Sequence, residues 1–282
     1  MNKKKTILIV CSVAAVFAAG VLVYVLTHKP TDDIKVADYT PKVEETTAPV
    51  VTEPEETTVY YPPFVNGLSL RAQEAYQSNP DTIGWIRISN TVIDYPLVKG
   101  KDNDFYVNHN FDKQPQDAGW VFMDYRNDFG PDYFSDNILT YGHNMANGTM
   151  FSDIKKYQRN VEFYEANPII EVSSLYADYQ YKVFAFMRCN GMKGSDFEFW
   201  NYTMFNPNPD DPWSLETYLA KIDEKSLITT NVDVKKGDKL LLLSTCDDGD
   251  TENPTRFVVL ARKVRPGEDA LEGTKGSVRR DQ

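Results

Sequence analysis

The sequence contains few of the side chains on which metal and nucleotide chemistry most often depends. It has only three cysteines and three histidines among 282 residues. Neither set follows the spacing of a zinc site, and no glycine-rich phosphate loop or dinucleotide fingerprint is present. No internal repeat is visible either. These absences argue against a zinc protein and against a nucleotide-binding protein.

Positive charge is also scarce. Lysine and arginine number 30 against 41 aspartates and glutamates, which gives a formal net charge of −11. Because a nucleic-acid partner requires a basic face, this balance argues against nucleic-acid binding. Aromatic residues make up 13% of the chain, which is typical of a packed core and not of a disordered chain. The length predicts one globular domain of about 200 residues with additional segments.

The N-terminal segment, residues 1–28, is predicted to be a short cytoplasmic stub and a transmembrane anchor. Three lysines precede Thr6–Leu26, which has 21 residues and no charge. As a helix this segment spans roughly 30 Å, the thickness of a hydrocarbon core. A cleaved signal peptide is the alternative, although its apolar region is usually only ~7–15 residues long. Small residues keep cleavage open: Ala14, Ala15, Ala18, Ala19 and Gly20.

The charges around this segment predict its orientation. Lys3, Lys4 and Lys5 precede it and Asp32 and Asp33 follow it, so the N-terminus is expected in the cytoplasm and the rest outside the cell. Residues 29–65 read as an extracellular linker. Between Lys29 and Tyr60 there are eight acidic residues, seven threonines and four prolines, without apolar periodicity. Such a segment cannot bury enough apolar surface to fold.

The main folded domain is predicted at residues 66–265, with a polar, frayed tail at 266–282. A helix near residues 68–77 opens it. A second helix lies at 211–226, where Asp211 is placed to cap it. Eight segments rich in β-branched and aromatic residues are predicted strands, which favours a mainly β barrel or sandwich with accessory helices. These are 84–88, 92–98, 118–125, 136–142, 168–174, 178–189, 239–246 and 256–264.

Cys246 ends an apolar run, and Arg256 opens the next one ten residues later. If the chain between them folds back as a hairpin, Arg256 lies beside Cys246, where a guanidinium favours a thiolate and stabilises an oxyanion. Two other interpretations stay open. Free cysteines are usually buried as small hydrophobic residues, and Arg256 is equally placed to pair with Asp247 or Asp248. Those two carboxylates disfavour a thiolate, so we expect mostly protonated thiol and slow turnover.

His143 follows a predicted strand and a glycine, where catalytic side chains often project from a rigid scaffold. A structural loop histidine is the alternative. His28 borders the membrane and is not expected to take part in catalysis, while His109 lies in an undetermined loop. A thiol, an imidazole and a guanidinium meeting at one end of a β domain suit acyl transfer. Spacing alone permits this arrangement without establishing it.

Three motifs resemble the sortases, membrane-anchored cysteine transpeptidases of Gram-positive bacteria. They are "TYGHNM" at Thr140–Met145, "LSTC" at Leu243–Cys246 and "TRFVVLARKV" at Thr255–Val264, in family order. "YPLVKGKDNDFYVNHNF", "AGWVFMDYRND" and the helix-bearing insertion resemble class B. The resemblance covers Asn66–Val264. It implies an eight-stranded sortase-type barrel preceded by N-terminal helices, with a helix between strands 6 and 7, so that residues 66–265 are the catalytic domain.

The resemblance also implies roles for individual residues. Cys246 would be the nucleophile, His143 the general acid and then base, and Arg256 the oxyanion or substrate anchor. Tyr141, Ser244 and Thr245 are assigned to the substrate groove. Leu242 stands where threonine is commoner in the family. No metal and no cofactor is expected, and a Cys189–Cys246 disulfide, which would silence the nucleophile, is not expected either.

The implied reaction cuts a C-terminal sorting signal after a threonine through a thioacyl enzyme. It then joins the surface protein to an amine of a peptidoglycan precursor of the lipid II type. Class B signals are often of the asparagine-proline-x-threonine type. Three alternatives remain: a pilus-assembling sortase that joins pilin subunits, a plain cysteine protease, and a catalytically inactive peptide-binding barrel.

Overall fold

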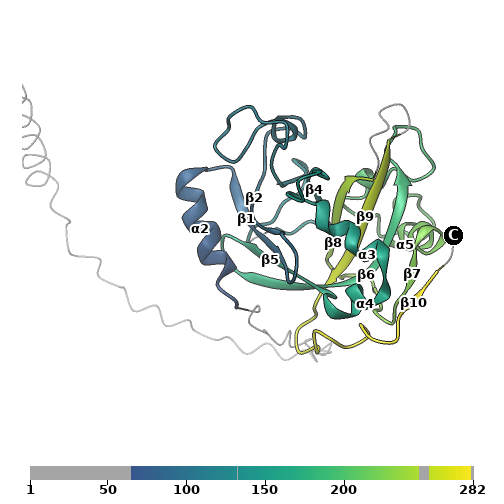
Figure 1. Cartoon of the computed structure of the whole chain (residues 1–282). Coiled ribbons are helices and arrows are strands. Elements are labelled where there is room, and N and C mark those ends of the chain that lie inside the picture. The colour runs from purple at the N-terminus through teal and green to yellow at the C-terminus, as the bar shows by residue number, and fades with distance from the viewer. Residues whose placement is uncertain (1–64, 132, 248–253, 281–282) are drawn as a thin grey trace, which may run out of the picture. The chain divides into compact units, whose positions relative to one another are not determined.

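The computed structural model describes residues 65–131, 133–247 and 254–280 (Figure 1). The predicted anchor lies outside the described residues, as does the predicted linker apart from Val65. Within the described ranges, no helix combines the length and the apolar character that crossing a bilayer requires.

Eight strands close into a barrel in the order β1-β2-β3-β4-β8-β9-β6-β5. The pairs β2–β3 and β4–β8 are parallel and the other neighbours are antiparallel. This confirms the predicted mainly β, eight-stranded fold. The strands are β1 Thr82–Ile88, β2 Asp94–Val98, β3 Phe122–Met123, β4 Asn137–Tyr141, β5 Ile169–Ser174, β6 Asp178–Asn190, β8 Leu240–Cys246 and β9 Thr255–Lys263.

Several short helices lie around the barrel. The predicted first helix is α2, Leu68–Ser78, which packs against β1, β2 and β5. A 3₁₀ turn, η1, spans Phe105–Val107. The sequence did not predict the helical stretch between β4 and β5, because its segments are too short for a clear apolar period. They are η2 Ser152–Lys155, α3 Lys156–Arg159 and α4 Val161–Ala166.

The insertion between β6 and β8 contains η3 (Phe199–Asn201), α5 (Leu215–Lys225) and β7 (Ile228–Thr229). The predicted helix is present, but Asp211 does not cap it. The side chain of Ser214 accepts the hydrogen bond from the backbone N–H of Thr217. The Asp211 carboxylate instead accepts from the backbone N–H of Trp213 and forms a local turn before the helix. The helix therefore begins later than Pro212.

The apolar run of β8 is buried on both of its faces. Leu241 and Leu243 belong to the core cluster that also contains residues of β1 and β5, whereas Leu240 and Leu242 pack with residues of the insertion. Successive side chains of a strand point to opposite faces, so the wall of the barrel separates two apolar layers. A strand covered on both faces reads as a continuous apolar run, as this one does.

The C-terminal tail is not frayed where the structure describes it, so that prediction was wrong. Val278–Arg279 form β10, which pairs antiparallel with β7. Earlier in the tail, Glu268 accepts hydrogen bonds from the buried cations Lys182 and Arg262. These interactions order the tail, because without Glu268 the buried Lys182 would lose its ion-pair partner and Arg262 its shortest one.

Candidate active site

The strand register places Cys246 and Arg256 directly opposite each other on β8 and β9. Both side chains share the face of β8 that carries Leu240 and Leu242, because alternate residues of a strand point the same way. They therefore project from the barrel wall toward the insertion. The predicted hairpin between the two residues is confirmed at the level of this pairing, although residues 248–253 lie outside the described part of the chain.

The guanidinium of Arg256 contacts the sulfur of Cys246. Its Nη1 donates to Sγ over 3.2 Å, and Cys246 is half-buried. Cys189 lies opposite Arg256 on the next strand, β6, and both cysteines are free thiols. Burial raises the pKa of the Cys189 thiol to about 12 and outweighs the opposing effects of Lys225 and Arg256. Cys189 is therefore an inert apolar residue, and Cys246 is the accessible thiol of the pair.

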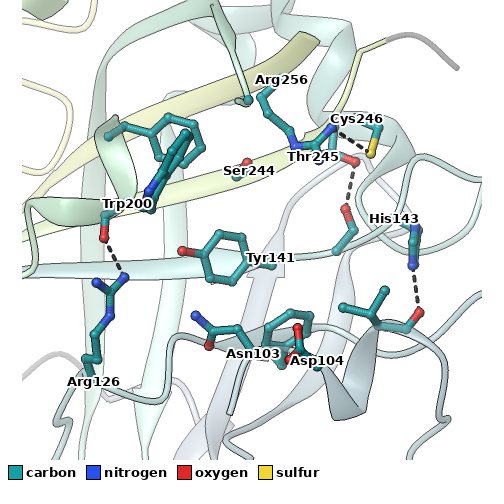
Figure 2. A pocket seen from close by; sticks show the side chains of 15 residues that line it. Asn103, Asp104, Arg126, Tyr141, His143, Trp200, Ser244, Thr245, Cys246 and Arg256 are labelled. Atoms are coloured by element: carbon teal, nitrogen blue, oxygen red, sulfur yellow. Dashed lines mark hydrogen bonds between the residues drawn. The ribbon is translucent and has the colours of Figure 1, made fainter. Parts of the chain in front are cut away.

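His143 lies beyond the end of β4, which runs parallel to β8. Gly142 precedes it, and a Cβ there would lie 2.7 Å from the ring of Phe151, so a side chain would not fit without displacing that ring. The Nε2 of His143 bonds to the carbonyl oxygen of Val107 over 2.7 Å (Figure 2). A carbonyl oxygen only accepts, so Nε2 must carry a proton. In the neutral ring, Nδ1 is then the free base.

The thiol of Cys246, the imidazole of His143 and the guanidinium of Arg256 all line one cavity of about 520 Å³. Figure 2 shows its lining, with Cys246, Arg256 and His143 at one end and Tyr141, Asn103, Arg126 and Trp200 toward the other. It is lined by all six residues that the sequence analysis singled out: Tyr141, His143, Ser244, Thr245, Cys246 and Arg256. A thiol, an imidazole and a guanidinium around one open cavity are suited to acyl transfer.

Comparison with known proteins agrees with this geometry. The family model of the sortase domain matches residues 86–264. The chain belongs to the sortase family.

Two sortase B enzymes are similar over most of the chain. That of Listeria monocytogenes is 36% identical over 186 residues, which cover 66% of this chain and 71% of the relative. That of Staphylococcus aureus is 33% identical over 187 residues, covering 66% and 72%. A solved S. aureus sortase B–substrate complex superposes with a TM-score of 0.61 at 30% identity, over 70% of this chain and 86% of that one. This chain is thus a class B sortase and a cysteine transpeptidase with a role related to the cell wall.

The three residues predicted to line the substrate groove of this sortase differ in how they face it. Tyr141 and Ser244 are paired across β4 and β8, on the face that carries Cys246. Thr245 points to the opposite face and is only 2% exposed. Its hydroxyl donates to the carbonyl of Gly142 over 2.7 Å, and so supports the turn that carries His143. The side chain of Thr245 is therefore placed to position the histidine rather than to contact substrate.

The carboxylate beside the thiol is not free. Asp247 is 6% exposed at its side chain and forms ion pairs with Lys155 at 3.0 Å and with Arg188 at 2.6 Å. Lys155 also donates to the Asp247 carbonyl oxygen. Two cations thus offset the negative charge that the sequence placed next to Cys246, and they come from η2 and β6, far away in the chain. Asp248 lies outside the described residues.

Sequence reasoning missed the far end of the cavity. Asn103 and Asp104 precede η1, Arg126 follows β3, and Trp200 lies in η3 of the insertion. The available signal was the polar triplet "DYR" directly after a buried strand, a position where functional side chains gather. His109 is not in the cavity lining; its ring stacks on Phe105 and its Nδ1 bonds to the Phe105 carbonyl.

Proposed function

We propose that this sortase is a membrane-anchored enzyme that cleaves a C-terminal sorting signal after threonine and joins the surface protein to a peptidoglycan-precursor amine of the lipid II type. The observation that supports this most directly is the 3.2 Å contact between Arg256 Nη1 and Cys246 Sγ inside an open cavity that His143 also lines. The elongated lining beyond Tyr141 supports a peptide as the substrate.

In the first half of the reaction, the thiolate of Cys246 attacks the carbonyl carbon of the threonine residue. The carbonyl oxygen becomes an oxyanion, which the guanidinium of Arg256 stabilises. The carbon–nitrogen bond then breaks, and the imidazolium of His143 gives its proton to the departing amine. The products are a thioester on Cys246, a neutral imidazole and the released C-terminal fragment.

In the second half, the acceptor amine attacks the thioester carbonyl. His143, now neutral, takes the proton of the attacking nitrogen, and the carbon–sulfur bond breaks to restore the thiolate. A new amide joins the surface protein to the acceptor. The enzyme returns to its starting protonation state, so protons and bonds balance over the cycle. The amine competes with water for the same thioester, which separates a transpeptidase from a hydrolase.

The proposed organisation follows the sequence. Residues 1–28 would anchor the enzyme with its N-terminus in the cytoplasm, residues 29–65 would act as an extracellular linker, and residues 66–265 would form the catalytic domain. The catalytic face would then lie outside the cell, where secreted substrates and the cell-wall precursor meet. This orientation is tested by adding protease to the outside of sealed cell membranes. The N-terminal peptide should be protected and the catalytic domain digested.

The reaction is tested with full-length enzyme in detergent and a library of quenched peptides of the asparagine-proline-x-threonine type. Each peptide is offered with and without a wall-type amine, a glycine or diamino-acid peptide. We expect cleavage, a thioester adduct on Cys246 by mass spectrometry, and an amide product that requires the amine. The Cys246→Ala variant should lose at least ~10³-fold in rate, because covalent catalysis needs the nucleophile.

Other results would identify the alternatives. Equal turnover with and without amine indicates a protease. Joining to a lysine of a pilin subunit in preference to the wall-type amine indicates pilus assembly. No adduct from any library peptide, with fully reduced protein, indicates a barrel that binds peptides without catalysis.

A further inference from the structure

Asp124 is a buried carboxylate next to the cavity that the proposed mechanism does not use. It follows β3 directly and its side chain is 0% exposed, although it does not line the cavity itself. Its backbone N–H donates to the carbonyl of Leu139 on β4. A buried carboxylate is costly unless it is paired and fully hydrogen-bonded, so its partners explain why it is there.

All of its side-chain partners line the cavity. Arg126 donates from Nε to Oδ1 over 2.8 Å and from Nη2 to Oδ2 over 2.7 Å. Asn103 donates from Nδ2 over 2.8 Å, and the hydroxyl of Tyr141 donates over 2.9 Å. One carboxylate therefore fixes three side chains that come from the segment before η1, the segment after β3 and the end of β4.

The network also reaches the opposite wall of the cavity. Arg126 Nη2 donates to the carbonyl oxygen of Trp200 in η3, which belongs to the insertion (Figure 2). At the other end, the side-chain Oδ1 of Asn103 accepts from the backbone N–H of Tyr125. Both walls of the distal cavity, the loop before η1 and the insertion, are therefore linked through a single buried anion.

We propose that Asp124 is a positioning residue that holds the two walls of the substrate cleft at the spacing the sorting signal needs, far from the reacting sulfur. The role rests on the proposed function of this cavity. It requires the ionised form, because only a carboxylate accepts the four side-chain hydrogen bonds, including the bidentate pair from Arg126, together with a fifth from the backbone N–H of Arg126.

The charge state agrees with this requirement. Burial pushes the pKa of Asp124 upward, but the hydrogen bonds from Arg126 and Asn103 outweigh burial and hold the pKa below its ordinary value. Tyr141 shows the complementary effect, since burial and the nearby Asp124 charge raise its pKa well above the ordinary value. Its hydroxyl proton therefore stays on the oxygen and remains directed at Asp124.

The test compares Asp124→Asn with wild type in the full-length enzyme. An asparagine is nearly isosteric but turns an N–H₂ group toward donors, so the network opens. With the quenched peptide that wild type cleaves fastest, we expect KM to rise about tenfold while kcat stays within about twofold. Alkylation of Cys246 by iodoacetamide should be unchanged, because the sulfur and Arg256 are not touched.

Asp178→Asn is the matched control. Asp178 is also buried, at 1% exposure, and accepts from the backbone N–H groups of Asn66, Gly67 and Ser69, all outside the cavity lining. It should lower the melting temperature without changing KM. An equal rise of KM in both variants, or no rise in Asp124→Asn, would overturn the proposal.

A second measurement does not depend on any peptide. In the free enzyme, Asp124→Asn should accelerate amide hydrogen exchange at residues 102–107 and 199–202 but not in β1. If Asp124→Asn does not fold, Arg126→Met replaces it and should accelerate exchange at 199–202 alone. Unchanged exchange in both segments rejects the positioning role. If exchange accelerates as expected but the wild-type enzyme cleaves no library peptide, the positioning role of Asp124 is supported and only the proposed reaction is rejected.

Discussion

Arg256 donates a hydrogen bond to the sulfur of Cys246, and the two residues are cross-strand partners in the β8–β9 pair. The antiparallel register of these two strands therefore places the guanidinium next to the sulfur. In the proposed reaction, a charged donor next to the sulfur would stabilise the oxyanion that forms after the sulfur attacks. We therefore expect the same side chain to act on the thiolate before attack and on the oxyanion after it.

Arg256→Met should lower kcat/KM of peptide cleavage by roughly 10²–10³-fold, the usual effect of losing one oxyanion donor. Arg256→Lys should lose less, because it keeps the charge but not the planar fork of donors. Alkylation of Cys246 by iodoacetamide should also slow at neutral pH in Arg256→Met. Steady-state kinetics and alkylation rates measure the two effects separately. Wild-type rates in both assays would remove Arg256 from the proposed mechanism.

The ion pairs of Asp247 predict a second electrostatic effect on the thiol. Asp247 directly follows Cys246 and the end of β8, and the charged or titratable groups that share the cavity with Cys246 are Arg256 on β9, His143 after β4, Asp104 before η1 and Arg126 after β3. Lys155→Met leaves Asp247 less well neutralised, so alkylation of Cys246 at pH 7 should slow about threefold, a size expected for one charge at a partly solvated site. Arg188→Gln should act in the same direction.

Lys156→Met is the control for both variants, because Lys156 pairs with Asp153 and not with Asp247. It removes the same charge from the neighbouring position. If Lys156→Met slows alkylation as much as Lys155→Met does, the effect is one of net charge and the specific pairing is irrelevant.

Much of this arrangement was predictable from local patterns. The apolar run of β8 and the following Arg256 predicted the hairpin, and the parity of a strand then places Cys246, Ser244 and Leu242 on one face. His143 was predictable as a residue after a strand end. These features depend on neighbours in the sequence or on one strand pair, where periodicity and turn chemistry carry enough information.

The remaining features depend on contacts between distant segments. The sequence placed Asp247 beside the thiol but gave no sign of Lys155 and Arg188, which approach from η2 and β6. No sequence pattern indicated that Asn103 and Tyr141 both donate hydrogen bonds to Asp124. Such pairings are decided by tertiary packing, which single-sequence patterns do not encode.

Gly191 is predicted to be necessary for the position of Arg256. A Cβ on Gly191 would lie 3.0 Å from Cγ of Arg256 and 3.0 Å from the carbonyl oxygen of Pro254. Gly191→Ala should therefore displace the guanidinium from the sulfur and reduce kcat/KM about tenfold, with little change in melting temperature. Gly130→Ala is the control, since its Cβ would have only the Tyr133 carbonyl oxygen nearby, at 3.9 Å. If kcat/KM is the same in Gly191→Ala and Gly130→Ala, the Arg256 side chain adjusts to the added Cβ without losing its position, and the prediction is wrong.

Glu268 predicts how stability changes with pH. Burial pushes the pKa of Glu268 upward, but hydrogen bonds from Arg262, Lys182 and the backbone of Arg265 outweigh burial and hold the pKa far below its ordinary value. The unfolded chain binds this proton near pH ~4.3, whereas the folded protein does not. The ionised group therefore contributes stability that is fully present above about pH 5 and is lost as the pH falls toward the folded-state pKa.

Glu268→Gln should remove this contribution, leave Lys182 buried without its anion and leave Arg262 with only its longer ion pairs to Asp233 and Asp238. We expect a loss of about 3 kcal/mol at pH 7, the usual effect of breaking a buried ion pair from one side. The difference from wild type should shrink as the pH falls from 5 to 3. Thermal unfolding across this range measures it, with Glu74→Gln as the control, because Glu74 is exposed on α2. A constant difference between pH 7 and pH 3 would show that the tail is held by packing and not by this charge.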